Sequence, residues 1–141
     1  ARLGTMMIGQ EIDALRVMGI NPVRFLVVPA LLAMVVMLPL LTFWSMIAAL
    51  FGAATYTYFE LGMSYRAFAD TILGVLNIDH VMHGIAKSAI FAVLVGLIGV
   101  VNGLAVSGGA EGVGRATTRS VVIAITAIIV TDMLFIFILT R

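Results

Sequence analysis

The stretch that decides the fold is FLVVPALLAMVVMLPLLTFWSMIAALFGAATYTYF, residues 25–59, in which no side chain is charged. A membrane-spanning helix needs about 20 apolar residues, so this stretch of 35 residues is longer than one crossing requires. Pro29 and Pro39 fall inside it, and proline removes a backbone donor and can kink a helix. The stretch therefore predicts either one long kinked helix that crosses a membrane once or a tight helical hairpin.

Two further membrane spans are predicted at residues 85–105 and 117–140. Residues 88–110 carry no charge, and residues 120–140 are interrupted only by Asp132. The whole chain is 62% hydrophobic with a mean hydropathy of +1.20 and only 11% charged residues, against about a quarter in soluble proteins. The fold class predicted is an all-α, polytopic membrane protein with about three transmembrane helices.

Composition also limits the chemistry. A net charge of +1 gives no reason to expect nucleic acid as a partner, and the lack of cysteine excludes disulfides and thiolate metal sites. Asp79, His80 and His83 lie close together in sequence, but a metal site needs more ligands than these three obviously supply. We therefore expect no metal and no enzymatic activity in this chain, with a membrane metalloenzyme that uses these three residues as a minor alternative.

A short amphipathic helix is predicted at residues 5–20. Its apolar and polar side chains fall on opposite faces, with Ile8, Ile12 and Leu15 against Gln10, Asp13 and Arg16. Gly19 suits the left-handed position that ends a helix, and Pro22 prevents its continuation. The residues alone leave two interpretations: a helix that rests on lipid headgroups, or one that transmits a push from a partner to the first span.

Residues 61–84, between the first two spans, are more polar and predict an interfacial segment. Tyr65, Phe68, Ile72 and Val75 recur there at helical spacing. This pattern is typical of a short amphipathic helix at the membrane surface. Packing under a neighbouring subunit is the other interpretation.

The second and third spans each carry a feature of possible functional value. Small residues at intervals of four predict a helix-packing seam on the second span: Gly84, Ser88, Ala92 and Gly96. Lys87 lies beside this seam and either snorkels to the interface or faces a cavity and meets an anionic headgroup. Asp132 is expected to face other helices, as a structural contact or as a proton carrier.

The linker GAEGVG, residues 109–114, has the glycine spacing of a phosphate-binding loop. Arg115 and Ala116 follow where that motif needs Lys and Ser or Thr, so nucleotide binding is not expected. The linker predicts a flexible turn followed by a helix that Thr117 or Thr118 caps. Arg115 and Arg119 would then lie among lipid headgroups.

The distribution of basic residues predicts the orientation. If residues 25–59 cross once, five arginines share one side, which the positive-inside rule makes cytoplasmic: Arg2, Arg16, Arg24, Arg115 and Arg119. Arg66, Lys87 and Arg141 then lie on or towards the other side. A hairpin would instead move the loop of Arg115 outside.

Two segments resemble a known family. EIDALRVMGINPVRFLVVP, residues 11–29, is similar to the coupling-helix segment of MlaE/YrbE-type permeases, and GGAEGVGRATTRSVV, residues 108–122, resembles their C-terminal motif. Lys87-Ser88 before an apolar span and Asp132 late in the last span also fit this family. The resemblance covers essentially the whole chain.

The resemblance implies a membrane subunit of an ATP-driven lipid transporter of the exporter type. Two permease copies would pair, each docked on a cytoplasmic ABC ATPase that holds ATP and Mg²⁺, so this chain would need no cofactor. MCE-domain proteins would exchange phospholipid on the other side of the bacterial inner membrane. By position, the residues that would contact the ATPase are Glu11, Ile12, Asp13, Leu15, Arg16 and Met18. Lys87 would face the lipid cavity, and the C-terminal motif would contribute Glu111, Gly114, Arg115, Thr117, Thr118 and Arg119.

Members of this family have an interfacial helix and further spans before the segment that Ala1 matches. Residues 1–141 would therefore be the C-terminal portion of a larger permease domain. The resemblance favours a single crossing by residues 25–59, with residues 61–84 on the periplasmic side. A structural scaffold that assembles such a complex without carrying lipid is the other interpretation.

Overall fold

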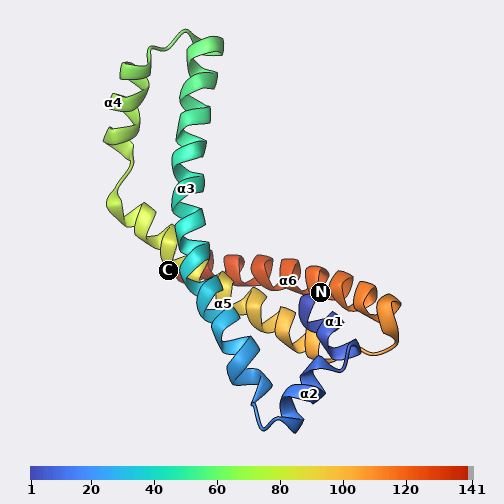
Figure 1. Ribbon diagram of the computed structural model, residues 1–141. Helices are drawn as coiled ribbons and strands as arrows, with labels where there is room; N and C mark the ends of the chain where they lie inside the picture. Colours follow the sequence, from blue (N-terminus) through green and yellow to red (C-terminus); the bar gives the residue numbers. More distant parts are fainter. Residues whose placement is uncertain (140–141) are drawn as a thin grey trace. The chain divides into compact units, whose positions relative to one another are not determined.

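The computed structural model describes residues 1–139, which form helices joined by short turns (Figure 1). The helices are α1 (Arg2–Ile8), α2 (Glu11–Val17), η1 (Val23–Val27), α3 (Val28–Leu61), α4 (Tyr65–Val75), α5 (Ile78–Leu104) and α6 (Gly109–Leu139). Helix accounts for 88% of the structure, with no strand among the described residues. Three segments are long and apolar enough to cross a membrane: Val23–Leu61, Ile78–Leu104 and Gly109–Ile138.

The chain is therefore an all-α polytopic membrane protein, as its sequence predicts. Its contacts divide it into two compact units, one made of Ala1–Val35 with Phe91–Arg141 and one made of Val36–Ile90. Helices α3 and α5 contribute to both units. Thr140, at the end of the predicted span 117–140, and Arg141 lie outside the described residues.

The first span is one continuous helix of 39 residues, Val23–Leu61, which excludes the hairpin. Pro29 follows the π-helical turn η1, whose wider hydrogen bonding accommodates the proline ring near the start of α3. Pro39 lies inside α3 without ending it. At 1.5 Å per residue the helix is about 58 Å long, against about 30 Å for the hydrocarbon layer. Tilting alone does not hide this length, so part of the helix extends beyond the hydrocarbon.

The segment predicted to be interfacial, residues 61–84, contains α4 and the first turns of α5. Ser64 caps α4, because its Oγ accepts a hydrogen bond from the Ala67 N–H at 3.3 Å. Helix α5 begins at Ile78, seven residues before the predicted start of the second span at residue 85. Asp79 lies in its first turn, where a carboxylate is favoured by the helix dipole. The last residues of the segment predicted to be interfacial therefore belong to the same helix as the second span.

Small residues of α5 lie at close contacts within the protein, as the spacing predicts for a packing seam. Ser88 is 8% exposed and Ala92 is fully buried. In the first unit, a Cβ added to Gly96 would collide with the side chain of Leu31. In the second unit, a Cβ on Gly84 would lie 2.5 Å from Met46 Cε. Small side chains thus let α3 and α5 approach closely.

We expect Gly96→Val to destabilise the protein, because the added methyl groups overpack the contact with α3 at a cost of about 1–3 kcal/mol. Gly99→Val is the matched control on the same helix, since a Cβ at Gly99 meets nothing within 4 Å. Thermal unfolding of the full-length protein in detergent measures the difference. Equal melting temperatures for the two variants would show that the seam does not limit packing.

Candidate functional site

The predicted helix 5–20 is divided into two helices, which corrects the sequence-based prediction. Gln10 adopts the left-handed conformation, with φ of 58°, between the end of α1 and the start of α2. The break rotates Ile8 away from the face that Ile12 occupies, and Ile8 is 38% exposed. Only Glu11–Val17 therefore forms the helix that precedes the first span.

Helix α2 has one fully buried side chain. Ile12 is 1% exposed and lines a small cavity of about 30 Å³ together with Leu3, Val27 and Leu104. These neighbours come from α1, from the beginning of the first span and from the end of the second. The family resemblance implied that Ile12 contacts the ATPase, whereas in the structure this side chain is buried within the protein.

The outer face of α2 combines charge with exposed apolar side chains. Asp13 and Arg16 form an ion pair at 3.5 Å, and both are about two-thirds exposed, so the pair adds little stability. Val17 and Met18 are 88% and 63% exposed. Val17 was missed by the sequence analysis, although its position beside Met18 at the end of the helix was the available signal. Leu15 is half-buried.

The link from α2 to the first span is short and ordered. Gly19 has φ of +75°, as predicted for the residue that ends the helix, and the Ile20 N–H donates to the Leu15 carbonyl at 2.9 Å. The Asn21 Oδ1 accepts from the Val23 N–H at 3.0 Å, just before η1 begins. Hydrogen bonds therefore fix the short connection between α2 and the base of α3.

Helix α1 supports this arrangement by packing against α2 and α6 (Figure 1). Gly4 is buried, and a Cβ added there would lie 2.9 Å from Val106 Cγ2. A Cβ on Gly103 would lie 3.0 Å from Leu3 Cβ. Glycine is needed at both positions because α1 approaches the end of α5 and the following turn so closely.

The turn between α5 and α6 is tighter than predicted. It comprises only residues 105–108, and the segment 109–114, expected as a flexible turn, is the first part of α6. Gly108 and Gly109 have φ of +86° and +73°, a region that glycine enters without strain. A Cβ on Gly112 would overlap the Ser107 carbonyl. The geometry of the turn therefore explains why glycine occupies positions 108, 109 and 112.

Thr117 and Thr118 do not cap α6, which corrects a second prediction. They lie two turns inside the helix, where their hydroxyls donate to the carbonyls of Val113 at 2.7 Å and Gly114 at 3.2 Å. Such bonds satisfy a hydroxyl within a helix. The two threonines therefore do not supply the helix cap that the linker predicted.

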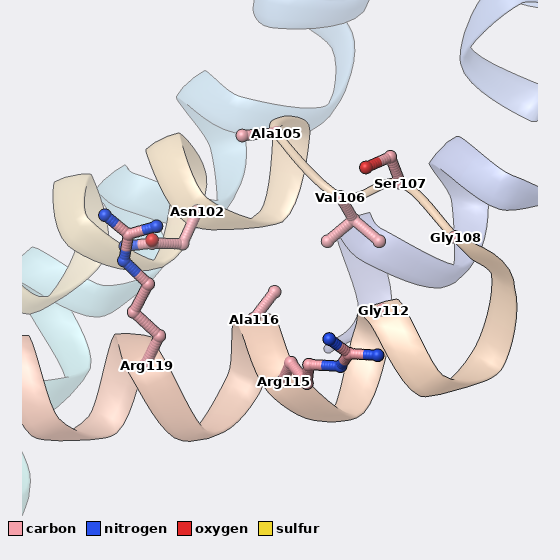
Figure 2. A pocket seen from close by; sticks show the side chains of 9 residues that line it. All are labelled: Asn102, Ala105, Val106, Ser107, Gly108, Gly112, Arg115, Ala116 and Arg119. Carbon is pink, nitrogen blue, oxygen red and sulfur yellow. The ribbon is translucent and has the colours of Figure 1, made fainter.

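A pocket of about 510 Å³ lies between the end of α5 and the beginning of α6 (Figure 2). Its polar lining comes from Asn102, Ser107, Arg115 and Arg119. The Glu111 carboxylate accepts from Arg115 at 2.6 Å, and both side chains are 77% exposed. In Figure 2, Arg119 extends from α6 towards Asn102 of α5. Asn102 was missed by the sequence analysis, because it appears as a lone amide in an apolar run.

Lys87 and Asp132 lie within α5 and α6, and both side chains are half-buried. Neither lacks an interaction partner. His80, from the minor metal alternative, accepts a hydrogen bond at Nδ1 from the Asn77 N–H at 3.4 Å. Among residues 1–139, no group of three or more His, Cys, Asp and Glu residues is placed to hold a metal ion.

Comparison with known proteins gives a consistent family. The family model described as Permease MlaE matches residues 1–138. A probable ABC transporter permease protein of Synechocystis is 32% identical over 132 residues, covering 94% of this chain and 50% of that protein. The chloroplastic protein Trigalactosyldiacylglycerol 1 of Arabidopsis thaliana is 30% identical over 132 residues, covering 94% of this chain and 38% of that protein.

A probable ABC transporter permease protein of Rickettsia typhi is 28% identical over 140 residues, covering 96% of this chain and 54% of that protein. The chain thus spans about half the length of the curated relatives it matches. The α2 segment and the glycine-rich turn fall within the range of the family model, which ends one residue before the end of α6. The chain belongs to the MlaE permease family.

Proposed function

We propose that this chain is part of the permease subunit of an ABC transporter that moves phospholipids or related lipids. ATP and Mg²⁺ bind to a partner ATPase, and two permease copies form the membrane core. The lipid passes between the bacterial inner membrane and MCE-type partner proteins. The relatives named as probable ABC transporter permeases support the transporter class.

The single observation that carries this proposal is that α2 has one side chain buried in the protein and apolar side chains exposed at its end. Buried Ile12 fixes the helix to the ends of two membrane spans, while Val17 and Met18 face outward. A helix that only rested on headgroups would turn its apolar side chains towards the lipid and would need no anchor in the protein. An anchored helix with an exposed apolar end is suited to receive force from a docked partner.

Two observations favour a lipid as the cargo. In the second unit, a mainly apolar pocket of about 540 Å³ is lined by α3 residues between Phe43 and Ala53, together with Leu76, His80 and Val81. An acyl chain fits such a lining, because all of its side chains except His80 are apolar. The Arabidopsis relative carries the name of a galactolipid, which supports the same class of molecule.

Motion would start at the ATPase and enter the permease through α2. Ile12 lines one small cavity with Val27 and Leu104, so a movement of α2 would act on the first and second spans together. The ordered link through Gly19 and Asn21 adds a covalent route to α3. The direction of lipid movement then depends on how the spans of two copies open.

We expect the double variant Val17→Glu/Met18→Glu to abolish coupling without unfolding the protein, because both side chains are exposed. Burying two carboxylates at a docked surface costs several kcal/mol, so ATP-driven lipid transfer should fall by roughly tenfold or more. The assay is phospholipid transfer by the full-length complex in proteoliposomes. Ala110→Glu, exposed at the start of α6, is the matched control. Unchanged transfer and assembly in the double variant would disprove the coupling role of α2.

A further inference from the structure

The pocket between α5 and α6 holds two guanidinium groups but only one carboxylate partner. Arg115 pairs with Glu111, whereas Arg119 forms no ion pair or hydrogen bond within the described residues 1–139. The Asn102 Nδ2 donates to the Ile98 carbonyl at 2.9 Å, which fixes the orientation of the amide. The pocket thus has a fixed polar wall and an excess of positive charge.

The pocket also lies at the edge of the apolar part of both helices. Arg119 directly precedes residues 120–131 of α6, which carry no charge. Asn102 lies two residues before the end of α5, after a charge-free run from Ser88. Two helices that both change from apolar to polar at this point place the pocket at headgroup depth. Buried Val106 and the methyl group of Ala116 complete a lining that is partly apolar.

We propose that this pocket binds the phosphate group of an anionic lipid of the cytoplasmic leaflet. Arg119 and Arg115 contact the phosphate oxygens, because a guanidinium matches phosphate geometry with paired donors. The Ser107 hydroxyl and the Asn102 amide oxygen are available to glycerol or headgroup hydroxyls. A volume of about 510 Å³ accommodates a glycerophosphate headgroup while the acyl chains remain in the bilayer.

The bound lipid would stabilise the base of the coupling helix. Val106 lines the pocket on one side and meets Gly4 of α1 on the other. Helix α1 in turn packs against α2. An occupied pocket therefore holds the turn on which α1 rests, which links membrane composition to the position of α2. This lipid is a fixed ligand at the edge of the membrane, separate from the apolar pocket proposed for the cargo.

The test uses the full-length permease in its complex, with a photoreactive amino acid at Ala105, which lines the pocket and is exposed. The protein is placed in nanodiscs of phosphatidylcholine with 20 mol % (about one lipid in five) phosphatidylglycerol, and captured lipid is measured by mass spectrometry. We expect capture of phosphatidylglycerol, reduced about fivefold or more by Arg119→Gln. Arg119→Lys should restore part of the capture, because it keeps the charge and loses the paired donors.

Arg24→Gln is the matched control, because Arg24 is an exposed arginine at the start of another span and does not line the pocket. If Arg24→Gln lowered the capture of phosphatidylglycerol as much as Arg119→Gln does, the capture would depend on general surface charge, and the proposal would be overturned. Capture of a protein partner in place of lipid would also overturn it. Inorganic phosphate at millimolar concentration tests whether the pocket binds free phosphate instead of the phosphate group of a lipid. If it suppresses capture completely, the pocket is a site for free phosphate; if capture persists, the lipid assignment stands.

Discussion

Replacing Ile12 with alanine is expected to release α2 from the membrane spans and to abolish coupled lipid transfer. Ile12 is the most completely buried large side chain among the described residues. Removing a buried isoleucine side chain costs about 2–5 kcal/mol. That loss falls on a seven-residue helix whose buried side chain lines a small cavity together with Leu3, Val27 and Leu104. A helix this short has little stability of its own, so the loss falls mainly on its docking.

Hydrogen exchange of the amides in Glu11–Val17 measures this release directly. We expect exchange to accelerate by roughly tenfold or more in Ile12→Ala, and ATP-driven lipid transfer to fall with it. Ile8→Ala is the matched control, because Ile8 is the same residue type on the preceding helix and is 38% exposed. If α2 exchanges at the parent rate in Ile12→Ala, the buried side chain is not its anchor.

The second large effect is expected at Gly112, where alanine should disrupt the turn between α5 and α6. A Cβ there would overlap the Ser107 carbonyl, a backbone atom that cannot rotate away. Relief requires the turn to open, at a cost of about 1–3 kcal/mol or more. Because Val106 in this turn contacts Gly4 of α1, the disturbance should reach α1 and, through it, the packing of α2.

Gly114→Ala provides a sharp control for Gly112→Ala. Both glycines lie in α6 without a positive φ, but a Cβ on Gly114 meets nothing within 4 Å. Since alanine is the better helix former, Gly114→Ala should be neutral or stabilising by up to about 1 kcal/mol. Thermal unfolding of the full-length protein compares the two. A similar melting temperature for both variants would contradict the close approach of Gly112 to Ser107.

The membrane spans were predictable because length and hydropathy dominate their formation. Residues 25–59 form a single helix, although two prolines made a hairpin equally consistent with the sequence. Whether the segment forms one helix or a hairpin depends on how η1 accommodates Pro29. Composition does not show this local backbone geometry. The start of α5 was placed too late because Asp79 and the two histidines were assigned to the interfacial segment, yet they lie in the first turns of α5.

The functional segments were less predictable because they depend on single backbone conformations. Nothing in the sequence signals that Gln10 adopts positive φ and divides the predicted helix 5–20. The periodicity of Ile8, Ile12 and Leu15 therefore suggested one face, of which only Ile12 is buried. The glycines at 108 and 109 were seen as a flexible linker, whereas their positive φ values build a tight turn.

The central claim is that the exposed end of α2 is the docking point of an ATP-hydrolysing partner. The most direct measurement places a photoreactive amino acid at Val17, which is 88% exposed, in the full-length permease within native membranes. Mass spectrometry then identifies what is cross-linked. The account predicts an ATPase subunit as the main product, lost in Met18→Glu. Cross-linking to lipid alone would contradict it and would make α2 a helix that rests on the membrane surface.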